Sequence, residues 1–114
     1  MKGLINPWGH AFDEWGQSFL TDGAGSQGIN FVFPRSVFAT SPGASRILTG
    51  LNPGQPKHCG LELLTGGHVP DDLQKVLAAP DFRGNRINLF KLTDNGSAYT
   101  SSQVEDLVSS KHRA

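Results

Sequence analysis

The sequence predicts an all-β fold made of short antiparallel hairpins. Residues 6–22 read NPWGHAFDEWGQSFLTD, in which Trp8, His10 and Phe12 alternate with other residues at a period of two, as side chains on a strand do. The segment Asp13–Gly16 has turn chemistry, because Asp opens tight turns and Gly accepts a positive φ. Alternation resumes after it. Two short strands around a D-x-x-G turn are typical of the repeating blade of a β-propeller.

The other predicted elements follow from β-branched and aromatic runs bounded by Gly, Pro, Asn and Asp. Strands are predicted at residues 9–13, 17–21, 28–33, 58–64, 74–79, 86–92 and 97–100, and residues 103–109 are also assigned as strand. Thr93-Asp94-Asn95-Gly96 is predicted as a turn that leads into residues 97–100. Residues 34–56 form a long irregular connection rich in Pro, Gly and Ser. No segment has the pattern of a helix that crosses over between parallel strands.

Length and composition bound the number of blades. The chain has 114 residues with 14 Gly, 7 Pro and 37% hydrophobic residues, which leaves a thin core for an independent unit. At roughly 40–50 residues per blade, the chain holds about two to two and a half blades. Blades are repeats that need neighbours to cover their faces. We therefore expect residues 1–114 to be a fragment of a single β-propeller domain, a partial propeller.

Charge and hydropathy exclude some classes of partner. Ten Lys and Arg balance ten Asp and Glu without a basic stripe, which argues against nucleic acid. No apolar run approaches the ~18 residues of a membrane span. The first residues also lack the basic and apolar regions of a signal peptide. Cys59 is the single cysteine, so it forms no internal disulfide, and Gly60 follows it instead of the pattern C-x-x-C-H that attaches haem.

Three segments resemble a known family. The hairpin NPWGHAFDEWGQSFLTD is similar to the blade hairpin NPxGLAFDxxGxLWVTD of the quinoprotein sugar dehydrogenases. Together with QPKHCGLELLTGGHVPDDLQ and DFRGNRINLFKLTDNGSAY, it resembles the propeller domain of the membrane-bound dehydrogenases of Planctomycetes and Verrucomicrobia. The resemblance implies a propeller of a six-bladed type. It also implies oxidation of a sugar or other alcohol, with electrons passing to a bound pyrroloquinoline quinone and then to a c-type cytochrome module outside this chain. It also implies a periplasmic or cell-envelope location, with a targeting segment upstream of Met1.

Two histidines are candidates for the catalytic base. In the quinoprotein relatives, polar residues at the starts of the innermost strands point into the central channel, and His10 and His58 are expected at equivalent places in two blades. A histidine near its ordinary pKa can take the proton of a hydroxyl as hydride leaves. We expect His58 to be this base or a ligand in the channel. The alternative is a histidine that caps its strand and bonds a neighbouring backbone carbonyl.

Two arginines are candidates for anion contacts. The segment DFRGNRINLFKL resembles SLKxRxLxRL of the quinoprotein sugar dehydrogenases, in which a basic residue contacts the acidic quinone. The resemblance therefore implies that Arg83 and Arg86 bind the cofactor, and a planar guanidinium suits a carboxylate. The alternative is a solvated hairpin end in which the arginines pair with Asp81 or Asp94.

The glycine-rich loop after residue 22 is not a dinucleotide site. Gly23–Gly28 fits G-x-G-x-x-G, but a β-prone segment follows it where the fingerprint requires a helix N-terminus. The required acidic residue ~20 positions later is also absent. The resemblance instead places this loop on the active-site face, with Asp22 and Asn30 as cofactor contacts. The alternative is a flexible loop between two strands of a blade, without a functional role.

No metal site is predicted. His58 and Cys59 have conceivable partners in His10, Glu62 and His68, but the spacing matches no known finger or ribbon. The aromatic residues are assigned to blade packing, namely Trp8, Phe12, Trp15, Phe19, Phe31, Phe33 and Phe90. The rival to a dehydrogenase is a non-catalytic propeller that binds a glycan or a protein partner through its loops.

Overall fold

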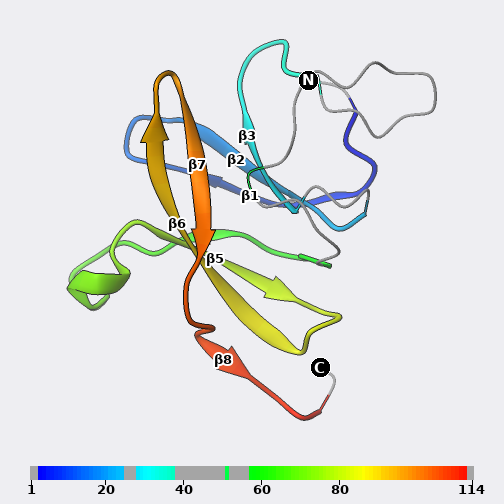
Figure 1. The fold of residues 1–114 in the computed structure, drawn as a ribbon, viewed down its shortest axis with the longest axis vertical. Coiled ribbons are helices and arrows are strands. Elements are labelled where there is room, and N and C mark those ends of the chain that lie inside the picture. The colour runs from blue at the N-terminus through cyan, green and yellow to red at the C-terminus, as the bar shows by residue number, and fades with distance from the viewer. Residues whose placement is uncertain (1–2, 25–27, 38–50, 52–56, 113–114) are drawn as a thin grey trace.

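Two antiparallel sheets make up the molecule in the computed structural model, which describes residues 3–24, 28–37, 51 and 57–112 (Figure 1). The first sheet has the strand order β1 (Pro7–Phe12), β2 (Ser18–Asp22), β3 (Gly28–Val32). The second has the order β4 (Glu62–Leu63), β5 (Val76–Asp81), β6 (Arg86–Asn95), β7 (Ala98–Gln103), and β8 (Val108–Ser109) pairs with β6. A 3-10 turn at Asp71–Leu73 is the only helical element within the described residues. The all-β prediction is confirmed.

The β1–β2 turn has the predicted chemistry. One carboxylate oxygen of Asp13 accepts hydrogen bonds from the backbone N–H groups of Trp15 and Gln17, at 2.9 and 2.8 Å. The N–H of Gly16 bonds to the carbonyl of Asp13 at 3.0 Å, and Gly16 has a φ of +76°. An aspartate side chain thus closes the turn from inside, while glycine supplies the left-handed backbone.

The predicted hairpins of the second sheet are confirmed, with three corrections. β5 pairs with β6, and β6 pairs with β7 through a turn at Gly96 and Ser97, since Asn95, a residue of the predicted turn, ends β6 and pairs with Ala98. The strand expected at residues 58–64 is reduced to β4 plus one bridge between His58 and Asp81. The strand expected at 103–109 is interrupted, because β7 ends at Gln103 and β8 begins at Val108. The irregular connection predicted at 34–56 lies mostly outside the described residues.

The core lies between the two sheets, which pack face to face. The buried side chains that form it are Ala11, Phe19 and Ile29 from the first sheet, and Leu61, Leu63, Leu77, Ala79 and Phe90 from the second. The ring centroid of Phe19 lies 5.5 Å from that of Phe31 and 5.4 Å from that of Tyr99. The packing of these aromatic rings stabilises the contact between the sheets beyond the area that it buries. Gly9 allows the backbones of the two sheets to approach each other, because a Cβ at this position would lie 2.3 Å from the carbonyl carbon of Gly60.

The two sheets repeat the same construction. Pro7 pairs with Asp22 in the first sheet, and His58 pairs with Asp81 in the second. The next backbone hydrogen bond is also the same in both sheets. The N–H of Gly23 donates to the carbonyl of Asn6 at 2.9 Å, and the N–H of Phe82 donates to that of Lys57 at 3.1 Å. In the strand that follows, Leu20 faces Asn30 and Ala79 faces Asn88. Pro7, Asp22 and Asn30 therefore correspond to His58, Asp81 and Asn88.

Large apolar side chains are exposed on the free face of the first sheet. Trp8 is 61% and Phe12 57% exposed, although Phe12 corresponds by register to Leu63, which is buried against the first sheet. The prediction that the aromatic residues pack is right for Phe19, Phe31 and Phe90. Trp8, Phe12, Trp15 and Phe33 are exposed, and the prediction that they pack against further blades stays a prediction. No helix in the described part of the chain is long and apolar enough to cross a membrane.

Candidate functional site

The candidate residues gather at one end of the two sheets. Asp22 ends β2, and Asp81–Arg86 connects β5 to β6 at the same end of the neighbouring sheet. The two sheets touch there, since a Cβ on Gly23 would lie 3.2 Å from the carbonyl oxygen of His58. The topology therefore places the turns that carry Asp22, Arg83 and Arg86 next to the lead-in of β4 that carries His58.

His58 is fully buried at 0% exposure. Its Nε2 lies 3.2 Å from Oδ1 of Asn88, and its ring packs edge-on against Phe90 with the centroids 5.5 Å apart. Because Nδ2 of Asn88 donates to Asp106 at 2.8 Å, the Asn88 oxygen faces the histidine and Nε2 must carry the proton. Nδ1 therefore holds the lone pair, and it has no hydrogen-bond partner among the described residues.

Burial keeps His58 neutral. Desolvation by the surrounding side chains lowers the pKa of His58 below its ordinary value of 6.5, and this outweighs the hydrogen bond to Asn88 and the charge of Asp81, which raise it. A neutral imidazole with an unprotonated Nδ1 has the form that a general base needs. No described hollow includes His58 in its lining, so its catalytic role stays a prediction.

A chain of polar side chains leads from His58 toward the surface. Asn88 links the ring to the carboxylate of Asp106, which also accepts a bond from the side-chain amide of Gln103 at 3.1 Å. The guanidinium of Arg86 then lies 3.5 Å from oxygens of both Asp106 and Asp81. The alternative of a paired hairpin end is therefore right for Arg86. Its side chain is 40% exposed, so the polar chain reaches solvent at this guanidinium.

Asp81 fixes the turn that presents Arg86. It is 4% exposed, and its Oδ1 accepts bonds from the backbone N–H groups of Lys57 and Arg83, both at 3.1 Å. Burial by itself would raise the pKa of Asp81, but the backbone hydrogen bonds from Lys57, Gly84 and Arg83 outweigh it, so the pKa lies below its ordinary value. Arg83 is exposed on this turn and follows Phe82, which is also exposed.

Asp22 and Asn30 lie in the corresponding places of the first sheet. The carboxylate of Asp22 accepts backbone N–H groups from Ile5, Asn6 and Ala24, at 3.0, 2.9 and 3.1 Å. Asp22 is thus occupied in closing its own turn, as Asp81 is. Asn30 is fully buried, with Nδ2 donating to two backbone carbonyls while Oδ1 has no partner among the described residues. The middle of the predicted loop, residues 25–27, lies outside the described residues.

His10 is not the equivalent of His58, so this prediction is wrong. Pairing of Ala11 with Phe19 and of Glu62 with Ala78 makes His10 correspond to Leu61, three positions beyond His58. Pro7 takes the place of His58 and has no side-chain donor to offer. His10 is exposed, with Nε2 2.8 Å from the hydroxyl of Ser18 and its ring 4.3 Å from that of Phe12.

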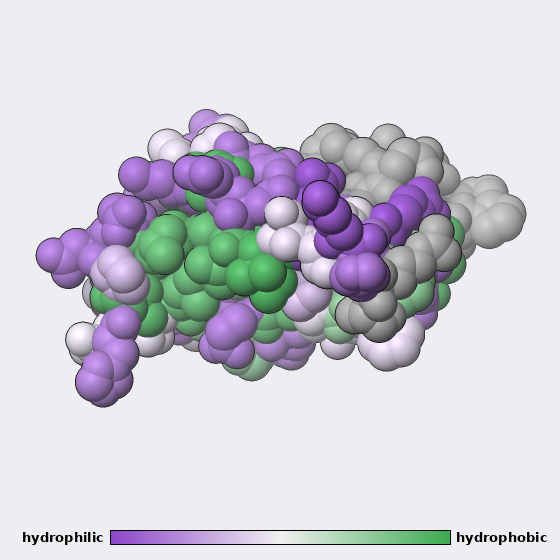
Figure 2. All heavy atoms as spheres, turned by 90° about the horizontal axis from the view of Figure 1, so that it is seen from below, coloured by the Kyte–Doolittle hydropathy of each residue, from purple (hydrophilic) through white to green (hydrophobic). Residues whose placement is uncertain are grey.

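An apolar hollow of about 300 Å³ opens beside this polar chain. It is lined by Cys59, Pro80, Asp81, Phe82, Asn85, Arg86, Ile87, Val108, Ser110 and His112. Figure 2 views this end of the molecule and shows apolar side chains gathered in one area with hydrophilic side chains at its margins. An apolar pocket with a few convergent polar groups is the ordinary form of a small-molecule site. Arg86 and Asp81 are the charged groups at this one.

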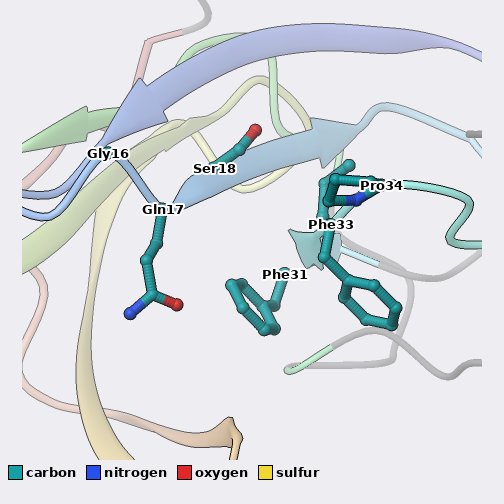
Figure 3. Close-up of a pocket in the computed structure, with 7 residues that line it drawn as sticks. Gly16, Gln17, Ser18, Phe31, Phe33 and Pro34 are labelled. Carbon is teal, nitrogen blue, oxygen red and sulfur yellow. The ribbon is translucent and has the colours of Figure 1, made fainter.

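Other hollows lie at the opposite end, near the β1–β2 turn. One of them, about 460 Å³, is an open depression lined by Gly16, Gln17, Ser18, Phe31, Val32, Phe33 and Pro34 (Figure 3). None of the predicted site residues contributes to it. The described residues contain no group of three or more His, Cys, Asp or Glu that could hold a metal ion.

Sequence reasoning missed Asn88 and Asp106. Asn88 lies between Ile87 and Leu89 in β6, and a polar residue within such an apolar run is itself a signal. Asp106 falls within the segment assigned to a continuous strand, and only the break between β7 and β8 brings it under Asn88.

Comparison with known proteins shows the fold. No family model matches the sequence, and no curated protein matches it. Among solved structures, the chain is similar to a protein of Thermus thermophilus described as a "putative oxidoreductase (glucose dehydrogenase)", with a TM-score of 0.75 and 18% sequence identity. The match covers 97% of this chain and 34% of the other, so the chain spans about a third of the structure that it resembles. The chain therefore has the fold of consecutive antiparallel blades of a β-propeller.

Proposed function

We propose that this chain supplies two blades of a quinoprotein-type dehydrogenase propeller that oxidises sugars or other alcohols. The observation that carries the proposal is the gathering of His58, the Asp22 turn and the Arg86 turn at one end of the two blades, beside an apolar hollow. The likeness to a fold that includes an oxidoreductase supports it. Further blades of the same polypeptide and a c-type cytochrome module are the proposed partners, in the periplasm or cell envelope.

His58 is the proposed base. Oxidation of an alcohol removes a hydride from carbon and a proton from oxygen, so the reaction needs an acceptor for each. The free lone pair on Nδ1 accepts the proton, and the chain Asn88–Asp106–Arg86 holds Nε2–H in place and stabilises the imidazolium that forms. Because the ring is fully buried, a substrate hydroxyl would reach Nδ1 only after a local rearrangement of the residues that cover it.

A quinone, when bound, supplies the acceptor for the hydride. The apolar walls of the 300 Å³ hollow suit one edge of a planar aromatic ring, and Arg86 stands at its rim. The charge of the hollow suits the acidic quinone less well, because the carboxylates of Asp81 and Asp106 already balance the positive charge of Arg86. Arg83, on the same turn, and cations from further blades would have to pair with the carboxylates of pyrroloquinoline quinone. The residues present thus fit its ring better than its charge.

The test uses a longer protein that contains the further blades. It is titrated with pyrroloquinoline quinone, and the absorbance of the quinone is then followed as glucose and a panel of sugars and alcohols are added. We expect reduction of the quinone by at least one of them. A His58→Gln variant keeps a donor toward Asn88 but lacks the ring base, so the rate should fall by about 10²–10⁴-fold. If the quinone binds and no sugar or alcohol reduces it, the proposal is wrong.

A non-catalytic propeller is the second candidate. The closed environment of His58 and the neutralised Arg86 favour it, because a scaffold has no need for a substrate to reach either group. Its signature is a glycan or protein that binds with equal affinity to the wild-type protein and to the His58→Gln variant, in the absence of any quinone.

A further inference from the structure

A groove lies at the end of the molecule opposite His58, between the two sheets. The β1–β2 turn is there beside the β6–β7 hairpin (Figure 1). Two hollows of about 240 and 260 Å³ flank the turn, and both are lined by Trp15, Asp94 and Tyr99. The same three residues thus line both depressions, which together are called the groove. This groove is separate from the proposed active site, and the inference does not depend on the proposed function.

The two aromatic rings of the groove are positioned differently. Tyr99 is anchored in the core, with its ring 5.0 Å from Phe31 and its hydroxyl 3.5 Å from a carboxylate oxygen of Asp13. Trp15 projects from the turn and is 79% exposed, the largest value among the exposed large hydrophobic residues. Its backbone is held by a bond from its N–H to Asp13 at 2.9 Å. An indole held at the tip of a rigid turn offers an open π-face to a ligand.

The charge at the groove is negative. Lys75 pairs with Glu14 at 2.6 Å, which balances both groups. Asp13 is occupied by the turn and by Tyr99. The carboxylate of Asp94 lines both hollows and makes no hydrogen bond or ion pair with any other described residue. Burial raises the pKa of Tyr99, and the charges of Asp13 and Asp94 add to this effect. A positive group placed here would be favoured by both carboxylates.

We propose that the groove binds an alkylated ammonium group, held between the faces of Trp15 and Tyr99 and paired with Asp94. A cation over an aromatic face is attracted by the ring quadrupole, and quaternary ammonium groups are weakly hydrated enough to leave water for such a site. The open carboxylate distinguishes this groove from a purely apolar pocket, because an apolar pocket gains nothing from a ligand's charge. Choline is the simplest probe.

The experiment compares choline with 3,3-dimethylbutan-1-ol, which has the same shape and no charge. Trp15 fluorescence is followed in a Trp8→Phe background, so that a single indole reports. We expect choline to bind at millimolar concentration and about tenfold more tightly than the neutral alcohol, in the range of a partly exposed cation–π contact. Added salt should weaken the choline signal, since exposed charges are screened.

Two variants separate charge from shape. Asp94→Asn should remove most of the preference for choline, whereas Asp72→Asn, at an exposed carboxylate outside the groove, should leave it unchanged. Equal binding of choline and the neutral alcohol would reduce the groove to an apolar hollow and overturn the proposal. A fluorescence change with glucose but not with choline would assign the groove to saccharides and would also overturn it. No change with choline up to about 0.1 M would overturn the proposal as well, because the groove is expected to bind choline at millimolar concentration.

Discussion

Replacing Asn88 by alanine tests the polar chain that holds His58. Asn88 is 2% exposed, bonds the histidine at 3.2 Å and donates to the Asp106 carboxylate at 2.8 Å. The change removes one neutral hydrogen bond, about 1 kcal/mol, and one to a charged group, about 1.5–3 kcal/mol. It also leaves Nε2–H of His58 buried without a partner. Because such terms overlap, we expect a loss of about 3–4 kcal/mol in the free energy of unfolding.

The chain contains a matched control in Asn30, which occupies the corresponding position of the first blade. Asn30→Ala removes the same atoms from an equally buried site, so the cavity contribution is shared. Only long bonds to two backbone carbonyls are lost, at 3.3 and 3.2 Å, and the unpartnered Oδ1 disappears. We therefore expect a loss of about 1 kcal/mol for Asn30→Ala.

Urea unfolding followed by tryptophan fluorescence measures both variants, at about pH 8 so that His58 is neutral in both states. The m-value should stay constant, which shows that the extent of unfolding is unchanged. The two variants should differ by about 2–3 kcal/mol. Equal losses would refute the reasoning, because they would mean that the bonds to His58 and Asp106 do not contribute in solution.

Further predictions concern pH, the core and the blade contact. Because the pKa of His58 is lowered from 6.5, the unfolded state binds a proton at pH values between the two pKa values, where the folded state does not. The free energy of unfolding should therefore be constant with respect to His58 above pH 6.5 and decrease as the pH drops toward the folded-state pKa. The urea midpoint of a His58→Phe variant should lack this decrease. Phe19→Ala should cost about 3–5 kcal/mol in thermal or urea unfolding, whereas Phe12→Ala, on the free face, should cost less than about 0.5 kcal/mol. Gly9→Ala should destabilise by about 3 kcal/mol or more, since its Cβ would overlap the backbone of the neighbouring blade; Gly67→Ala, which meets open space, should be close to neutral.

The hairpins could be predicted from sequence because their signals are local. Asp13 and Gly16 form the turn that their chemistry indicates, and the alternation of Trp8, His10 and Phe12 does place the three on one face. An alternating pattern shows that the two faces of a strand differ, but it does not show which face a neighbouring sheet covers. The aromatic set proved to be the exposed one, because the second blade packs against Gly9 and Ala11 instead.

The candidate site was predicted less well, for a reason of register. Pro7 and His58 are equivalent only through Asp22 and Asp81, with which they pair. These aspartates are distant from them in sequence, so the residues around the two histidines do not show that His10 lies three positions further along its strand. Asp22 has the loop position expected of a ligand, yet three backbone N–H groups occupy it. The clustering of His58 with Arg86 depends on Asp81 and Asp106, and both of these aspartates are distant from His58 in sequence.

The protonation state of His58 tests the account most directly. Long-range proton–nitrogen NMR correlations report which ring nitrogen carries the proton and the pH at which the ring titrates. The structure predicts the Nε2–H form and a pKa below 6.5, with Nδ1 unprotonated at neutral pH. A ring protonated on Nδ1 would contradict the hydrogen bond from Nε2–H to Asn88, and a ring that titrates at its ordinary pKa would contradict the burial of His58. Either result would remove the support for the proposed base.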